Sequence, residues 1–233
     1  MRRTSPRSFA TLAVISLVTA ACSGPESYEN LMDLGVCAPN SAAFTLEIDN
    51  PFFPLPVGRQ IVLEGGSSSG EELVRITVLD EVERVAGVET RVVEEYEALD
   101  GRVVEISRNY FAQTSDGTVC YFGEEVDVYD SAGNVTSHAG GWRADDATNV
   151  PGIFMPAEVV VGQSFQQEIA PGIAEDQAKV VALGEVTEVP AGTFEDTVTL
   201  LDLDPLGGGQ DEKVYAAGVG LIVDGPVRST SVT

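Results

Sequence analysis

Segments rich in valine, isoleucine, tyrosine and phenylalanine alternate with short turn sequences through the middle of this chain. Asp100-Gly101 separates residues 89–99 from residues 102–114, and Asp116-Gly117 separates the second segment from residues 118–130. Asp-Gly between such segments is a strong short-range signal for a β-hairpin. The pattern predicts a meander of long antiparallel strands, in which paired valines indicate curvature or burial on both faces.

The same pattern extends toward both ends of the chain. Residues 59–65 and 72–82 flank a Ser/Gly loop, and strand-like sequence returns at residues 164–170, 193–203 and 212–224, the last two separated by a Gly-rich loop. Residues 171–189 fit either a short helix or a bent strand. We expect an all-β protein: a single antiparallel meander that forms a barrel or half-barrel, with a long irregular loop and room for one short helix.

The long irregular loop covers residues 139–162 and holds the only tryptophan of the chain, Trp142. A loop of this length is uncommon in a compact domain, and it either carries function or covers one end of the fold. We predict that it closes one end of the barrel and that Trp142 and Phe154 face a ligand-binding cavity there. The alternative is that Trp142 fills the barrel as part of its core.

The chain opens with the sequence of a secretory signal. Three arginines precede an apolar run from Phe9 to Val18, and small residues follow it. This order is typical of a cleaved signal, and the run is shorter than the about 20 residues that a spanning helix needs. The expected organisation has three parts: a lipoprotein signal peptide (residues 1–21), a lipid anchor with a polar tether (residues 22–39), and one β-rich domain (residues 40–228).

The end of this signal resembles the bacterial lipobox, in which the cysteine after the cleavage point receives a diacylglyceryl group. Cys22 occupies that position. A lipobox usually has Leu, Val or Ile three residues before the cysteine, where this chain has Thr19, so ordinary cleavage without lipid is the alternative. The resemblance implies a protein of the cell envelope, outside the cytoplasm, anchored to a bacterial membrane through lipid on Cys22.

Acidic residues dominate the charge of the chain. The formal net charge is −24, and the mature chain without residues 1–21 keeps 10 basic against 37 acidic residues, a balance of −27. Such a charge repels the phosphates of nucleic acids and anionic lipids, so we expect no nucleic-acid partner. It favours solubility in the first place, and attraction of a cation or a basic partner in the second.

Cysteine usage points to an oxidising compartment. With Cys22 assigned to lipid, Cys37 and Cys120 remain as a pair, and we predict a disulfide between them. Two separate buried thiols are the alternative. Neither cysteine belongs to a C-x-x-C motif, which leaves redox catalysis unsupported.

Two features superficially resemble catalytic motifs. Gly66–Gly70 fits G-x-S-x-G, but that motif needs a strand-to-helix elbow, and here a Ser/Gly tract joins two strand-like segments. His138 is the only histidine, so a histidine-rich metal site is not available, and we expect a surface or packed side chain. We therefore assign no catalytic residues and no cofactor.

Acidic clusters are the remaining metal candidates. Residues 202–212 resemble a calcium loop, but Leu206 and Lys213 stand where the EF-hand pattern needs oxygen ligands, so we expect a hairpin loop and no metal. A looser acidic set could converge on a cation, or it could form a solvated rim: Glu124, Glu125, Asp127, Asp145, Asp146, Glu175 and Asp176.

Longer motifs extend over most of the mature chain. NPFFPLPVG at residues 50–58, YFGEE, PGIFMPA and PGIAEDQA in the middle, and VPAGTFEDTVTL with KVYAAGVGLI near the end look similar to uncharacterised bacterial lipoproteins and periplasmic β-proteins. The resemblance implies an extracytoplasmic β-barrel or half-barrel, and it brings no catalytic residue or cofactor. We expect a non-enzymatic, envelope-anchored module that binds an apolar small molecule or a cation. A secreted hydrolase with acidic catalytic residues and a purely structural envelope protein are the alternatives.

Overall fold

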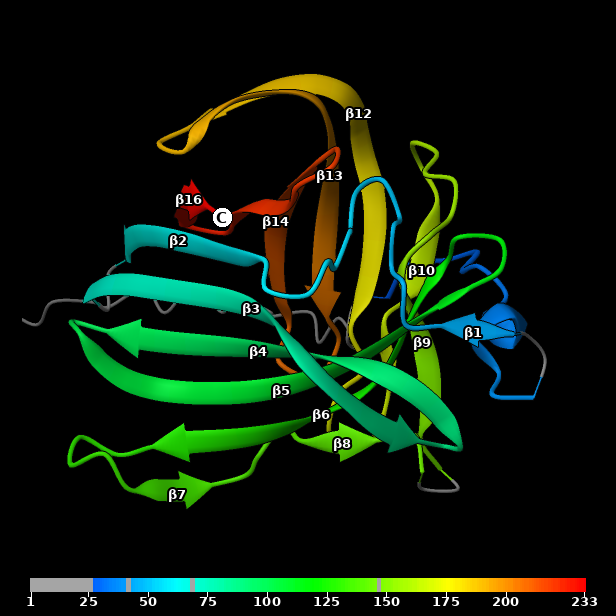
Figure 1. The fold of residues 1–233 in the computed structure, drawn as a ribbon, viewed down its shortest axis with the longest axis horizontal. Coiled ribbons are helices and arrows are strands. Elements are labelled where there is room, and N and C mark those ends of the chain that lie inside the picture. The colour runs from blue at the N-terminus through cyan, green and yellow to red at the C-terminus, as the bar shows by residue number, and fades with distance from the viewer. Residues whose placement is uncertain (1–26, 41–42, 68–69, 146–147) are drawn as a thin grey trace, which may run out of the picture.

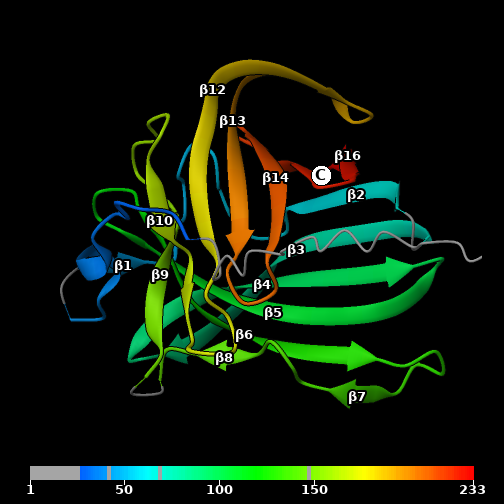
Figure 2. The ribbon, with the colours of Figure 1, turned by 180° about the vertical axis from the view of Figure 1, so that it is seen from behind.

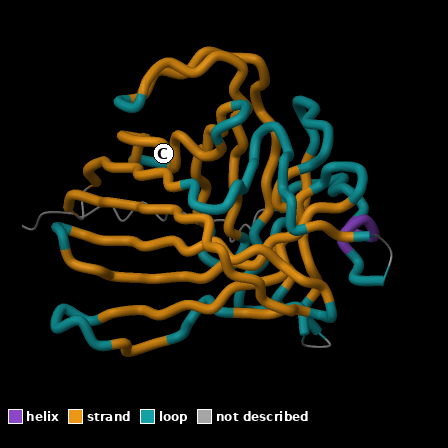
Figure 3. The backbone as a smooth tube through the Cα atoms, in the orientation of Figure 1, coloured by secondary structure: helices purple, strands orange, loops and turns teal. Residues whose placement is uncertain are grey.

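The computed structural model describes residues 27–40, 43–67, 70–145 and 148–233, and it confirms the all-β class. Sixteen strands form one antiparallel sheet that curls into a nearly closed barrel (Figure 1). Within these ranges the helical content is one 3-10 turn, η1 (Leu34–Cys37), as Figure 3 shows. The described residues contain no helix that is long and apolar enough to cross a membrane. The strands are β1 (Phe44–Thr45), β2 (Gln60–Ser67), β3 (Gly70–Val85), β4 (Val88–Leu99), β5 (Arg102–Thr114), β6 (Val119–Tyr129), β7 (Val135–Ser137), β8 (Trp142–Arg143), β9 (Val150–Met155), β10 (Ser164–Gln166), β11 (Glu168–Ile169), β12 (Gln177–Val189), β13 (Gly192–Asp204), β14 (Gly209–Ala216), β15 (Gly220–Asp224) and β16 (Val227–Val232).

The predicted meander corresponds to strands β2 to β6, which pair in chain order. Asp100 and Gly101 join β4 to β5 with φ angles of 50° and 73°. Positive φ at both central residues is the two-residue turn that matches the twist of a hairpin. Asp-Gly adopts this conformation readily, and the sequence therefore identified this hairpin correctly.

The chain itself closes the ring of strands. The hydrogen-bonded path starts at β10 and ends at β11, and Gln167 alone separates these two strands in the sequence. Gly152 on β9 permits the close approach, since a Cβ atom there would lie 1.9 Å from the carbonyl oxygen of Gln167. β6 pairs with β9 only near Tyr121, and its later part pairs with β7 and β8. The barrel is thus sealed at one end, and the strands diverge toward the other (Figure 1).

An aromatic cluster fills the sealed end of the barrel. The ring of Phe53 lies 5.2 Å from Phe111, 4.5 Å from Phe154 and 6.2 Å from Tyr215. Asn50 fixes the loop that carries Phe53, because its amide donates to the carbonyls of Gly117 and Pro156, both at 2.9 Å. The loop of residues 50–53 therefore inserts Phe53 into the end of the barrel and fills it.

The disulfide predicted between Cys37 and Cys120 is confirmed. It attaches η1 to β6, with the two Cα atoms 5.6 Å apart at a sequence separation of 83. Residues 27–39 of the predicted tether lie against the barrel, as the hydrogen bond from the amide of Met32 to the carbonyl of Ser164 shows. The signal peptide and Cys22 lie outside the described residues. The disulfide indicates an extracytoplasmic domain.

Two segments differ in detail from the pattern expected of them. The long loop at residues 139–162 contains β8 and β9, so it is partly regular and contributes to the barrel wall. Residues 171–189 form a turn and the strand β12, which bends through three register shifts. The β12–β13 hairpin arches over the C-terminal strands (Figures 1 and 2), where Val189 and Phe194 pack with Ile222 in a second small core.

Candidate functional site

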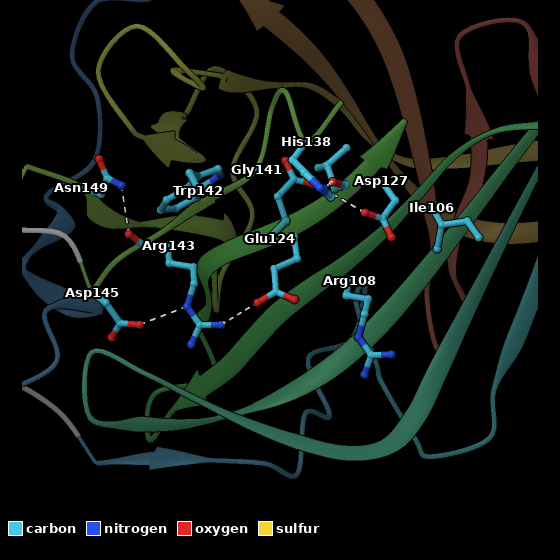
Figure 4. Close-up of a pocket in the computed structure, with 12 residues that line it drawn as sticks. Ile106, Arg108, Glu124, Asp127, His138, Gly141, Trp142, Arg143, Asp145 and Asn149 are labelled. Atoms are coloured by element: carbon cyan, nitrogen blue, oxygen red, sulfur yellow. Dashed lines mark hydrogen bonds and ion pairs between the residues drawn. The ribbon is translucent and has the colours of Figure 1, made fainter. Parts of the chain in front are cut away.

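A groove of about 730 Å³ lies over β5, β6 and β8 (Figure 4). Ile106 and Arg108 come from β5, and Trp142 and Arg143 come from β8. The turn between β7 and β8, with His138 and Gly141, forms one rim. β6 lies between these elements, because its partner changes from β9 to the short strands β7 and β8. The departure of β9 from β6 therefore produces the groove.

Arg143 organises one side of the groove. Its guanidinium contacts three carboxylates: Glu83 at 2.9 Å, and Glu125 and Asp145 both at 3.1 Å. It also lies over the ring of Tyr110 at 5.1 Å, in cation–π geometry. The planar guanidinium is suited to holding several acceptors at once. Arg143 thus joins β3, β6 and the segment after β8 into one rigid wall.

His138 is at the opposite rim, with three quarters of its side chain exposed. Its Nδ1 lies 2.8 Å from the carbonyl oxygen of Val126 and 2.9 Å from a carboxylate oxygen of Asp127. The ring is therefore oriented by two acceptors on one strand. Of the two alternatives expected from the sequence, a surface or a packed histidine, the structure has the surface one.

Trp142 connects the groove to the aromatic cluster. The residue is 4% exposed, and its ring meets Tyr121 edge-on at 5.5 Å. Its indole nitrogen is buried and has no hydrogen-bond partner among the residues that the structure describes. Phe154 lies 5.7 Å from the same tyrosine and is part of the cluster, away from the groove. The predicted common cavity of Trp142 and Phe154 is therefore replaced by shared packing, and the ligand-binding role of Trp142 stays a prediction.

The structure brings together part of the predicted acidic set. Glu124, Glu125, Asp127 and Asp145 line the groove. The carboxylate of Glu175 accepts a hydrogen bond from the amide of Gly172 at 2.9 Å, away from them. Asp146 lies outside the described residues. Within the described ranges, no group of three or more histidine, cysteine, aspartate or glutamate side chains is arranged to hold a metal ion.

A second acidic surface, which the sequence interpretation missed, lies inside the barrel. Glu95 and Glu97 follow Val93 on β4 at alternate positions, and they stand opposite Ile76 and Val74 on β3. The partners of those two residues on β2 are buried in the core, so Glu95 and Glu97 face inward. Burial, then Glu97 and Asp224, raises the pKa of Glu95 to about 8. Burial, then Glu105 and Asp224, raises the pKa of Glu97 to about 7. The sequence does contain a signal for these inward acids: in a strand, alternate residues face the same side, and Glu95 and Glu97 alternate with Val93 of the core.

Other strands contribute carboxylates to the same interior. Burial, then the charge of Glu105, raises the pKa of Glu124 to about 7. Burial and the charge of Asp204 raise the pKa of Asp176 to about 6. Asp202 on β13 pairs with Lys213 on β14 at 3.1 Å. Several of these carboxyls are thus partly protonated near neutral pH.

The two motif-like segments form hairpins. Ser67 pairs with Gly70 at the end of the β2–β3 ladder, so a strand follows the Ser/Gly tract where a hydrolase elbow needs a helix. Ser68 and Ser69 lie outside the described residues. In the calcium-like segment, a carboxylate oxygen of Asp204 accepts from the amides of Leu206 and Gly207, both at 2.8 Å. That carboxylate therefore closes the β13–β14 turn.

The structure is a nearly closed β-barrel that carries a groove lined by both acidic and basic side chains. Searches against protein-family models, curated proteins and solved structures find no match to this chain.

Proposed function

We propose that this chain is an envelope-anchored lipoprotein whose barrel is a non-enzymatic binding module, with its ligand in the groove beside Trp142. The observation that carries the proposal is the buried, unpartnered indole N–H of Trp142 at a groove of about 730 Å³. Buried polar groups normally have a hydrogen-bond partner, and this donor lies just behind the wall of a groove. A ligand acceptor can therefore reach it when the side chains of that wall shift. The anchor rests on the lipobox resemblance at Cys22, and the disulfide supports the compartment.

The charged side chains of the groove favour binding over catalysis. Arg143 forms ion pairs with three carboxylates, His138 lies against the carboxylate of Asp127, and Arg108 pairs with Glu81. Such paired groups hold a fixed shape, which suits recognition of a ligand.

The composition of the groove favours a ligand with an apolar body and a positive group. Ile106, Val126 and Trp142 provide apolar surface. Glu125, Asp127 and Asp145 against two guanidinium groups leave an acidic excess along the groove, and Glu124 adds its charge from the interior of the barrel. A cationic ligand with one hydrogen-bond acceptor would satisfy both the excess charge and the indole N–H.

Native mass spectrometry of protein purified from its own host tests the proposal, since a retained ligand appears as added mass. Trp142→Phe keeps an aromatic ring and removes the N–H, so we expect this variant to lose the ligand. Tyr96→Phe is the matched control, because Tyr96 lies under Arg75 on another part of the outer surface. Equal ligand mass on all three proteins would contradict a site at Trp142, and no added mass on the wild type would contradict the binding function.

A further inference from the structure

The inner face of the barrel changes from apolar to acidic along each strand. On β4 the inward positions run from Val93 to Glu95 and Glu97, and on β13 they run from Leu200 to Asp202. On β5, Glu105 stands directly opposite Glu97 in the ladder. The aromatic cluster thus fills one end of the interior, and carboxylates from several strands line the rest.

The carboxylates belong to two walls that face each other. Glu95 on β4 interacts electrostatically with Asp224 on β15, Lys213 on β14 and Glu124 on β6. None of these strands adjoins β4, so the interactions cross the interior of the barrel. Glu95, Glu97 and Lys213 are only partly buried, so solvent reaches the space between the walls. A pocket of about 290 Å³ beside Val74 and Glu97 provides room for a solute at this surface.

Two oxygen atoms in this interior have no partner among the described residues. The hydroxyl of Ser229 is on a residue with 0% exposure, and one carboxylate oxygen of Asp202 is also buried. Ser229 pairs with Leu63, Leu63 with Val74, and Val74 with Glu97, so the serine and the glutamate lie in one row across the inner face. The carboxylate oxygen of Asp202 lacks a donor, and the hydroxyl of Ser229 can either donate or accept, so both leave a hydrogen bond unmade.

We propose that this acidic inner surface binds a linear organic polycation of the polyamine class. Directly opposed carboxylates such as Glu97 and Glu105 have Cβ atoms about 5 Å apart, a spacing that successive ammonium groups can follow. Val74 and Ile76 are only partly buried, lie opposite Glu97 and Glu95, and provide apolar contact for the methylene segments. A bare metal ion fits less well, because the described carboxylates are spread over separate strands and form no metal-binding group. This site lies inside the barrel, and the inference goes beyond the groove function.

Isothermal titration calorimetry with spermine at pH 8 and low salt tests the site. The double variant Glu97→Gln/Glu105→Gln removes two inward carboxylates and relieves their repulsion, so its fold should persist. We expect spermine to bind the wild type and to bind this variant at least about tenfold more weakly, the loss typical of one charged hydrogen bond. Binding should weaken at pH 5, where Glu95, Glu97 and Glu124 are protonated.

The control Glu64→Gln/Glu71→Gln removes the same charge from exposed positions on β2 and β3. Unchanged spermine affinity in this control supports a specific inner site. Equal weakening in both double variants, or equal competition by magnesium at matched ionic strength, would show general charge attraction and overturn the proposal. Binding of tetralysine without binding of spermine would also overturn it, in favour of a basic peptide.

Discussion

Glu95 provides a quantitative test of the acidic interior. Its carboxyl has an ordinary pKa of 4.5, which burial and the neighbouring Glu97 and Asp224 raise to about 8 in the folded protein. Between these two pH values the folded chain binds more protons than the unfolded chain. The stability that the protonated Glu95 provides to the folded state is therefore fully present below pH 4.5, and it is lost as the pH rises toward 8.

The size of this loss follows from the shift. The pKa difference between the folded and the unfolded chain lowers the free energy of unfolding at pH 8, relative to acidic pH, by at most about 4 kcal/mol. Glu95 is partly solvent-accessible and lies near Lys213, so we expect about half of that, about 2 kcal/mol. Glu95→Gln removes the charge at nearly constant shape. It should stabilise the protein by about 2 kcal/mol at pH 8 and leave its stability nearly unchanged at pH 5.

Urea unfolding at pH 5 and pH 8, at constant ionic strength and without polyamine, measures the effect. The fluorescence of Trp142 reports unfolding, because it is the only tryptophan and is buried in the fold. Glu89→Gln is the control, since Glu89 is exposed on the same strand. A Glu95→Gln variant that is less stable than the wild type at pH 8, or that shows the same difference at both pH values, would refute the reasoning.

Three further predictions concern the anchor, the disulfide and the tryptophan. Lipid on Cys22 should carry the protein into the detergent phase, and Cys22→Ser should release it into the aqueous phase; a variant still bound to membranes would exclude this anchor. Cys37→Ala/Cys120→Ala should lower the free energy of unfolding by about 4 kcal/mol, as the chain-entropy model gives for so long a loop, and urea denaturation with equal midpoints would contradict this. Trp142→Ala should cost about 3–5 kcal/mol, because the ring packs on Tyr121 in the core; a melting temperature near that of the wild type would show that the ring is not part of the packing.

The local sequence was sufficient for the hairpins and for the disulfide. Asp100-Gly101 specifies its turn through positive φ angles that few other residue pairs adopt. Cys37 and Cys120 were paired by counting cysteines in an oxidising compartment, and their contact across 83 residues confirms it. The acidic set could be predicted only in part, because Glu125 and Asp145 meet through Arg143. Asp145 is close to this arginine in the sequence, but its partners Glu83 and Glu125 belong to other strands.

What the sequence determined by itself was the β class, the hairpin order and the charge, because turns and two-residue periods act over a few neighbouring positions. Only the tertiary structure decided which alternate positions face inward and how the walls meet. Closure through Gln167 and Gly152 brings β4 opposite β14 and β15, so Glu95 and Lys213 come to share one interior. It also packs Trp142 against Tyr121, a contact that depends on where β9 leaves β6. These relations depend on the curvature of the whole sheet, to which every strand contributes.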